Sequence, residues 1–194
     1  MIKLMIRLAV IGDIGSGKSF VAKQFGYPVF NADAEVAKLY KKSRKCYKRL
    51  KITLPNYITS FPVKKIELSK AIMANQNNLK KIVKIVHPEI RFRMNNFIKK
   101  NKKKKFVILD IPLLLENNLN KKNDILIFIN AKKKDINKRL KKRSNQKSRK
   151  ILKKFQLPIE LKKKKADFII KNNFTRKLIK KDVKMIMKKI LSNA

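Results

Sequence analysis

Residues 12–19 read Gly-Asp-Ile-Gly-Ser-Gly-Lys-Ser and match the pattern G-x-x-x-x-G-K-[ST], in which a glycine-rich turn holds phosphate groups. Residues 4–11, which precede it, read LMIRLAVI, an almost unbroken apolar run that is typical of a buried parallel strand. Residues 20–25 continue with the apolar spacing of a short helix. Strand, glycine turn and helix therefore follow in the order that a phosphate-binding loop requires.

The chemistry of this motif indicates ATP as the ligand. Successive backbone N–H groups of such a loop surround the phosphates, and the positive end of the next helix faces them. Lys18 is expected to reach the β- and γ-phosphates, and Ser19 to ligate Mg²⁺. Taken alone, the motif is also compatible with a simple turn that binds no ligand. The expected ATP contacts in this segment are Gly12, Asp13, Ile14, Gly15, Ser16, Gly17, Lys18, Ser19 and Phe20.

Length and composition narrow the class of protein. A chain of 194 residues suits one domain with a small inserted part. The single cysteine, Cys46, cannot form an internal disulfide. No apolar run approaches the roughly 20 residues that a membrane span needs, and no sequence of signal-peptide type precedes the glycine turn. We expect a cytoplasmic monomer with no membrane partner.

The net charge of +41 raises the possibility of a nucleic-acid partner. Of the 53 basic residues, however, 44 are lysines and nine are arginines, and the lysines fall in runs such as residues 102–105 and 162–165. Proteins that read bases depend on bidentate arginines and stacked aromatic residues, and neither is interleaved here. We interpret the lysine runs as solvated faces that follow a compositional bias, and expect no specific nucleic-acid partner.

Apolar runs alternate with helical patterns along the rest of the chain. Further strands are predicted at 27–30, 106–111, 125–129 and 168–170, and helices at 34–45, 133–142 and 176–191. Residues 46–60 look irregular, whereas 63–101 have helical spacing, with a kink or boundary expected near His87 because Pro88 follows. This alternation predicts a three-layer α/β domain with a five-stranded, mostly parallel sheet.

Ligands of such sheets bind beyond the carboxyl ends of the strands. Gly12, Asp33 and Asp110 each follow or end a predicted strand and should lie along that edge. We therefore divide the chain into a core of residues 1–45, 102–142 and 166–194, a helical insertion of residues 46–101 for a second substrate, and a lysine-rich lid of residues 143–165.

Several further segments, taken with the phosphate loop, resemble the dephospho-CoA kinase family over nearly the whole chain. Residues 31–33 (Asn-Ala-Asp) are similar to the family's Asp-Ala-Asp, and residues 110–116 (Asp-Ile-Pro-Leu-Leu-Leu-Glu) to its strand-end signature. The remaining similarities are Ala74-Asn75, residues 87–91 (His-Pro-Glu-Ile-Arg), the pair Arg139 and Arg143, Gln156, Ala166-Asp167 and Asn172. The resemblance implies a P-loop kinase fold with a helical CoA-binding insertion and a lid.

The resemblance also implies a reaction, the transfer of the ATP γ-phosphoryl group to the ribose 3′-hydroxyl of dephospho-CoA. Asp33 would accept or orient the proton of that hydroxyl, although it could also serve as a helix N-cap. Lys18 and Ser19 keep the roles given above, and Asp110 would support the magnesium shell through water. Mg²⁺ is the expected cofactor, and ATP and dephospho-CoA are the expected partners.

Other residues receive roles from the resemblance alone. Arg143 would act as a catalytic lid arginine that also contacts ATP, and Arg139 would contact ATP beside it. Asn172 would contact the adenine, unless it only forms a turn. His87 and Arg91 would bind dephospho-CoA, although a histidine beside a proline is ordinarily a packing residue. Asp33, Asp110, Pro112 and Leu113 complete the expected substrate contacts.

Two positions depart from the family pattern. Asp13 replaces a glycine and brings a carboxylate near the phosphates, so we expect its side chain to point outward or to bind lysine, water or the metal shell. Asn31 replaces the first aspartate of the triplet, which concentrates the expected chemistry on Asp33. The alternatives are another small-molecule P-loop kinase, acting on a nucleoside or nucleotide, and a basic nucleic-acid-associated protein that binds NTP.

Overall fold

The structure is a computed structural model that describes residues 5–141, 153 and 155–192. These residues divide into two compact units, a sheet unit formed by the described residues before 32 and after 100, and a helical unit of residues 32–100. The helical unit therefore includes the helix that follows the second strand, which the sequence-based division assigned to the core. No helix among the described residues combines the length and the apolar character that a bilayer crossing needs.

The sheet unit contains five strands in the order β2-β3-β1-β4-β5, and every neighbouring pair is parallel. The strands are β1 (Ile6–Gly12), β2 (Val29–Asn31), β3 (Phe106–Asp110), β4 (Ile125–Asn130) and β5 (Phe168–Lys171). All five predicted strands are confirmed to within two residues at each end. The three inner strands are buried on both faces, which is why their sequences read as continuous apolar runs rather than as alternating ones.

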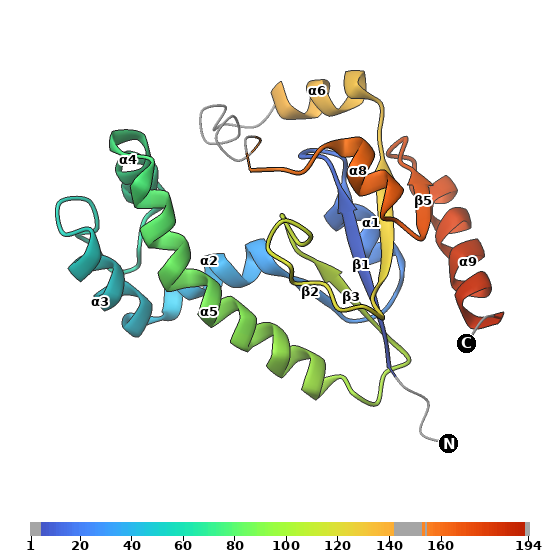
Figure 1. Ribbon diagram of the computed structural model, residues 1–194, viewed down its shortest axis with the longest axis horizontal. Coiled ribbons are helices and arrows are strands. Elements are labelled where there is room, and N and C mark those ends of the chain that lie inside the picture. The colour runs from blue at the N-terminus through green and yellow to red at the C-terminus, as the bar shows by residue number, and fades with distance from the viewer. Residues whose placement is uncertain (1–4, 142–152, 154, 193–194) are drawn as a thin grey trace. The chain divides into compact units, whose positions relative to one another are not determined.

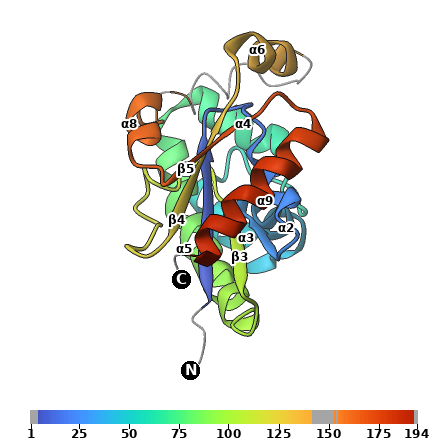
Figure 2. The same cartoon turned by 90° about the vertical axis from the view of Figure 1, so that its right-hand side faces the viewer.

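Helices cover both faces of this sheet. Helices α1 (Lys18–Gln24) and α9 (Arg176–Ser192) pack on one face, and their residues Val21, Ile179 and Val183 join the buried core with Leu8 and Val10 of β1. Helix α8 (Ile159–Lys164) packs on the other face, against β1 (Figures 1 and 2). A further helix, α6 (Lys133–Lys141), follows β4. The three-layer α/β prediction is confirmed.

The helical unit consists of α2 (Ala32–Lys42), α3 (Arg44–Thr53), α4 (Lys65–Ala74) and α5 (Asn77–Lys100). Helix α5 contacts the other three, and its buried residues Ile82, Val86 and Ile90 belong to the core of this unit. The irregular structure predicted for 46–60 is wrong in its first half, because α3 occupies it. Ser43 caps α3 by accepting a hydrogen bond from the Cys46 N–H at 3.1 Å.

Helix α5 also runs without interruption through Pro88, so the boundary expected near His87 is absent. A proline inside a helix removes one backbone hydrogen bond and costs about 3 kcal/mol in an isolated helix. Here Ile85 and Val86 before it, and Ile90 and Met94 after it, are all buried. Packing on both sides of the proline therefore maintains the helix.

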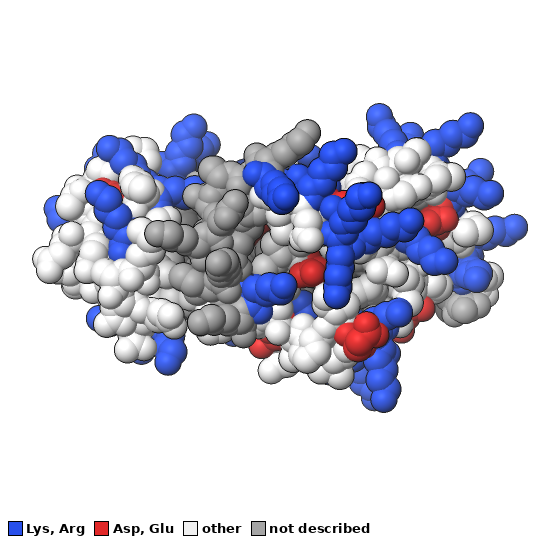
Figure 3. Space-filling model, turned by 90° about the horizontal axis from the view of Figure 1, so that it is seen from above, with Lys and Arg blue, Asp and Glu red and all other residues white. Residues whose placement is uncertain are grey.

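Basic side chains are dispersed over the surface. On the face drawn in Figure 3, lysine and arginine side chains project from many places, and a few acidic groups lie among them, rather than forming one continuous stripe. This arrangement is in keeping with lysines that occupy solvated faces. One lysine of the run 162–165 is an exception, because Lys162 is only 3% exposed.

Candidate functional site

The phosphate loop lies at the carboxyl end of β1 and leads directly into α1. Gly17 is the N-cap of that helix and has a left-handed backbone with φ of 88°. A Cβ atom at Gly17 would collide with the side-chain amide of Asn172, and one at Gly15, with φ of 83°, would approach Leu140 to 3.0 Å. The loop therefore needs glycine at both positions, for its backbone conformation and for space.

Lys18 lies over its own loop. Its Nζ donates to the main-chain oxygens of Asp13 at 2.8 Å and Gly12 at 3.2 Å. The Asp13 carboxylate accepts the N–H of Ile14 at 2.6 Å, a contact that the sequence analysis did not predict. The carboxylate of Asp13, which stands where the family has glycine, thus binds a backbone N–H of the loop. The Lys18 ammonium group binds backbone carbonyl oxygens of the same loop.

A second cluster joins the ends of three elements beside the loop. The Asn31 side-chain amide, at the end of β2, donates to Asp110 Oδ2 at the end of β3 and to Ser19 Oγ at 3.4 Å. Asp110 is only 2% exposed. Sequence reasoning identified Ser19 and Asp110 but treated Asn31 only as a lost carboxylate. Its position at a strand end, on the edge where ligands bind, was the available signal.

This cluster suits a magnesium ion that is held mainly by a nucleotide. Hydroxyl and carboxylate oxygens are the hard donors that Mg²⁺ prefers, and Ser19 and Asp110 provide one of each. The described residues contain no group of three or more histidine, cysteine, aspartate or glutamate side chains that could hold a metal by themselves. Phosphate oxygens and water would therefore have to complete the coordination shell.

Asn172 braces the loop from the end of β5. Its buried Nδ2 donates to Ser16 O at 2.7 Å, and its Oδ1 accepts the N–H of Phe174 at 2.8 Å. The backbone N–H of Asn172 also donates to Asn130 O at 2.7 Å. With both side-chain polar atoms engaged and 2% of the residue exposed, Asn172 is suited to positioning the loop rather than to the predicted adenine contact.

Arg139 stacks on an aromatic ring that the sequence analysis did not single out. Its guanidinium carbon lies 4.2 Å from the centre of the Phe174 ring, a cation–π distance. Phe174 follows β5 and adopts φ of 63°. A Cβ added to Gly17 would approach this ring to 2.9 Å, so the stack lies beside the phosphate loop. Arg143, the other predicted lid arginine, lies outside the described residues.

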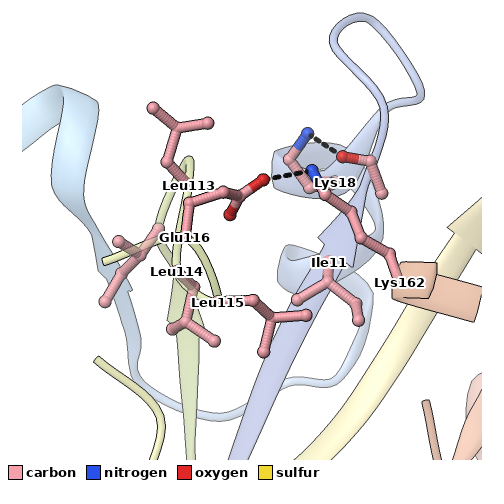
Figure 4. Close-up of a pocket in the computed structure, with 9 residues that line it drawn as sticks. Ile11, Lys18, Leu113, Leu114, Leu115, Glu116 and Lys162 are labelled. Atoms are coloured by element: carbon pink, nitrogen blue, oxygen red, sulfur yellow. Dashed lines mark hydrogen bonds and ion pairs between the residues drawn. The ribbon is translucent and has the colours of Figure 1, made fainter. Parts of the chain in front are cut away.

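A narrow pocket opens between the loop and the segment after β3. Figure 4 shows it, lined by Ile11, Gly12, Lys18, Ile111, Leu113, Leu114, Leu115, Glu116 and Lys162. Leu113, a predicted substrate contact, lies in this lining, whereas its neighbour Pro112 is exposed. Three of the lining residues carry charge, namely Lys18, Glu116 and Lys162. The last two were not among the predicted site residues.

The remaining predicted residues belong to the helical unit. Asp33 is exposed in the first turn of α2, two residues after the end of β2. His87 is half-buried on α5, and Arg91 is exposed one turn later. Burial, and secondarily the positive charge of Arg91, lower the pKa of His87 below its usual value. His87 is therefore neutral at neutral pH and can accept or donate a hydrogen bond.

Comparisons with known proteins identify the family of the chain and agree with its fold. The sequence profile described as dephospho-CoA kinase matches residues 6–177. The dephospho-CoA kinase of Wolbachia pipientis wMel is 33% identical over 186 residues, which cover 93% of this chain and 95% of the relative. The crystal structure of a Thermus thermophilus protein superposes with a TM-score of 0.77 at 26% identity, covering 98% of both chains. A dephospho-CoA kinase structure from Campylobacter jejuni has the same fold, with a TM-score of 0.63 at 24% identity, covering 95% of this chain and 96% of that one.

Proposed function

Since the chain belongs to the dephospho-CoA kinase family, we propose that its phosphate loop binds ATP and that Asp33 receives the proton of the acceptor hydroxyl. The family phosphorylates dephospho-CoA with ATP in the final step of coenzyme A synthesis, and the chain is a kinase of this kind. The alternative acceptors considered above, a nucleoside or a nucleotide, are thereby set aside. What remains to be assigned is the role of each residue.

The nucleotide site is assigned to the loop and its neighbours in the sheet unit. The backbone N–H groups of the loop and the start of α1 provide donors for the phosphates, and Lys18 provides a positive charge. Arg139 and Phe174 provide a flat surface beside the loop for the adenine, with Asn172 holding Ser16 in place beneath it. The hydrogen-bonded cluster of Ser19, Asn31 and Asp110 next to the loop is the observation that carries this assignment.

Magnesium is assigned to Ser19 and Asp110, with Asn31 orienting the carboxylate. When bound with ATP, the ion would neutralise charge on the β- and γ-phosphates. The protein's own part is to present one hydroxyl and one carboxylate at fixed positions. The short strands and helix that carry them are anchored in the buried sheet, so little reorganisation accompanies binding.

Asp33 is assigned to the acceptor. The ribose 3′-oxygen attacks the γ-phosphorus, the bond from that phosphorus to the β,γ-bridging oxygen breaks, and ADP leaves. The hydroxyl proton passes to the Asp33 carboxylate. Because the transition state is loose, positioning contributes more than deprotonation. Asp33 follows Asn31 by two residues, which limits their separation to about 7 Å, so chain connectivity alone keeps it near the edge where β2 ends.

The helical unit is assigned to dephospho-CoA. His87 and Arg91 lie one turn apart on α5 and can offer a neutral hydrogen-bonding group and a positive charge to the same anionic ligand. We retain residues 46–101 as the insertion that binds the acceptor and a monomer as the working form. Of residues 143–165 we retain as the lid the part that precedes α8, because α8 packs against β1. We also retain the cytoplasm as its location. The absence of a specific nucleic-acid partner is retained as well, in keeping with the basic side chains dispersed over the face drawn in Figure 3.

A coupled assay of ADP release tests the proposed function. With ATP and Mg²⁺, the wild-type protein should release ADP only when dephospho-CoA is added, and the product should be coenzyme A. Asp33→Asn should lower kcat by about 10²–10⁴-fold, the usual contribution of a positioned general base. Glu35→Gln, two residues later on the same helix, is the matched control and should keep kcat within about threefold. A loss of less than about tenfold for Asp33→Asn would remove Asp33 from the base role.

A further inference from the structure

A second lysine lines the pocket beside Lys18. Lys162 comes from α8, and its side chain is only 4% exposed. Its Nζ lies 2.7 Å from Glu116 Oε1, and the Glu116 side chain is 9% exposed. Lysine is almost never fully buried unless it is paired, so this position requires the carboxylate. Lys162 is the first of four consecutive lysines, and it is buried whereas the other three are exposed.

The pair is held in a defined geometry. The oxygen of Glu116 that binds Lys162 also accepts the backbone N–H of Leu157 at 3.0 Å. Burial would raise the pKa of Glu116, but the hydrogen bonds and charge from Lys162 and the Leu157 N–H bring it below the ordinary value. Glu116 is thus a carboxylate at neutral pH. It fixes two points of the chain, just before α8 and within it, onto the segment that follows β3.

Stability alone is a weak explanation for such a pair. Replacing a buried ion pair by neutral groups of similar size is often harmless to stability. The chain has a second buried pair, Arg7 with Asp124, whose atoms approach to 2.8 and 2.9 Å where β1 begins. That pair connects the starts of β1 and β4 and lies away from the phosphate loop. Glu116 and Lys162 instead lie where β1 ends, in the lining that includes Gly12 and Lys18.

The charges in the pocket favour an anion. Figure 4 shows the ammonium groups of Lys18 and Lys162 directed toward the same part of the pocket, with Glu116 paired to Lys162. An ammonium group has three N–H donors, and the contact with Glu116 uses one. A bound phosphate would therefore meet two cations and one carboxylate.

We propose that Lys162 is a second cationic contact for the γ-phosphoryl group of ATP, held beside Lys18 by Glu116. The proposal rests on the proposed binding of ATP by the phosphate loop. During transfer, negative charge is spread over the equatorial oxygens of the phosphoryl group. A cation that is already fixed in a buried site stabilises that charge without having to reorganise. Glu116 is a positioning residue, which holds Lys162 so that it is directed at the pocket.

The test compares the binding of two nucleotides by calorimetry in the presence of Mg²⁺. One is ADP, and the other is β,γ-imido-ATP, which carries the γ-phosphoryl group but is not transferred. The main variant is the double substitution Glu116→Gln with Lys162→Met, which removes both charges and leaves neither one unpaired. The matched control, Arg7→Met with Asp124→Asn, neutralises the other buried pair in the same way. The single variant Glu116→Gln removes only the carboxylate.

The double variant should bind the ATP analogue at least about tenfold more weakly and ADP within about threefold of wild type, since only the analogue has the γ-phosphoryl group. Its kcat should fall by about 10²-fold or more. The control pair should leave the ratio of the two affinities unchanged. Glu116→Gln removes a repelling charge but also releases Lys162, so it should change the affinity for the analogue while leaving that for ADP within about threefold of wild type. Its kcat should fall because Lys162 is no longer directed at the pocket.

Equal weakening of both nucleotides by the double variant, or no change in either, would overturn the proposal. If the double variant does not fold, Glu116→Gln decides the question. A change in analogue affinity with ADP affinity unchanged supports the proposal, and a parallel change in both, or no change in either, contradicts it. Failure of the proposed function would look different, because the wild-type protein would then not bind the analogue at all.

Discussion

The sheet unit and the helical unit each contain a glutamate whose side chain is largely removed from solvent, and the two glutamates have different partners. In the helical unit, Glu67 Oε1 accepts from the N–H and hydroxyl groups of Thr59 and Ser60 at 2.8–3.2 Å, and Oε2 accepts the Lys64 N–H at 3.3 Å. All of these donors are neutral and lie within eight residues. In the sheet unit, Glu116 binds a lysine and a backbone N–H from more than 40 residues away.

The difference separates a structural carboxylate from one beside a binding site. Glu67 fixes the loop before α4 with local donors, including the capping box of that helix, and leaves no charge for a ligand. Glu116 pairs with a charge of opposite sign in a pocket that already contains Lys18. We infer that the sheet unit concentrates its charged groups around a phosphate site, whereas the helical core uses charge to hold its own loop.

The largest expected effect concerns Lys18, the residue on which the charge of the pocket depends. Lys18→Met should lower kcat by about 10³-fold, because a fixed cation is lost where charge develops in the transition state. Steady-state kinetics with dephospho-CoA measures this. Lys23→Met, an exposed position on the same helix, is the control and should be nearly silent. A Lys18→Met enzyme with more than a tenth of wild-type activity would contradict the phosphate role.

The next effect concerns the cluster beside the loop. Asn31→Asp introduces a carboxylate next to Asp110 and Ser19, where the amide now donates to both. The added charge should strengthen Mg²⁺ binding and lower the Mg²⁺ concentration for half-maximal rate by about three- to tenfold, which corresponds to roughly 1 kcal/mol. A titration of rate against Mg²⁺ measures it. An unchanged midpoint would argue against a metal at this cluster.

Glu67→Gln probes the structural side of the comparison. The amide cannot accept all of the hydrogen bonds, so the free energy of unfolding should fall by about 1–3 kcal/mol at pH 7. Burial tends to raise the pKa of Glu67, but its hydrogen bonds from Thr59, Lys64 and Ser60 lower it below the ordinary 4.5. The contribution of the Glu67 carboxylate to the free energy of unfolding is therefore complete above pH 4.5. It is lost as the pH falls through the pKa of Glu67 in the folded state, which is lower.

Urea unfolding at pH 7 and in acid measures that dependence. The difference between wild type and Glu67→Gln should shrink as the carboxyl becomes protonated. Glu89→Gln in the same unit is the control, since Glu89 has only a 3.9 Å contact with the exposed Lys45 and should change stability little. A constant difference across this pH range would show that Glu67 does not titrate as the hydrogen bonds imply.

The smallest expected effect concerns the stack beside the loop. Arg139→Met keeps much of the side-chain volume but removes the cation over Phe174. A half-exposed cation–π pair contributes about 0.5–1 kcal/mol, so the KM for ATP should rise about two- to fivefold with kcat nearly unchanged. Lys138→Met, the exposed neighbour, is the control. A fall in kcat of tenfold or more would assign Arg139 to the reacting group instead of the adenine.

The strands and the phosphate loop could be predicted from the sequence because their physical causes are local. Strands buried on both faces must be apolar throughout, as in β3, and the loop needs glycine where φ is positive. Helix α3 was missed because Cys46 and Leu50 are its only buried residues and basic residues surround them. Its capping residue, Ser43, was the signal that could have identified it.

The rest of the site depends on contacts between distant parts of the chain. Lys162 cannot be distinguished from its neighbours in a run of four lysines, because only the position of α8 against β1 buries it. Asn172 has the composition of a turn residue, and its contact with Ser16 spans 156 positions. From the sequence, Asn31 was interpreted only as the loss of an aspartate. In the structure, its side-chain amide donates to two predicted site residues, Ser19 and Asp110.

The brace at Asn172 has a consequence for the order in which the protein matures. The glycine loop is synthesised first, and the side chain that secures Ser16 follows it by 156 positions. Nascent chains that stop before residue 172 carry the complete nucleotide motif without its support. Competence to hold a nucleotide is thus expected only after residue 172 has been synthesised, and a chain cut before that residue is expected to lack it while the motif itself remains intact.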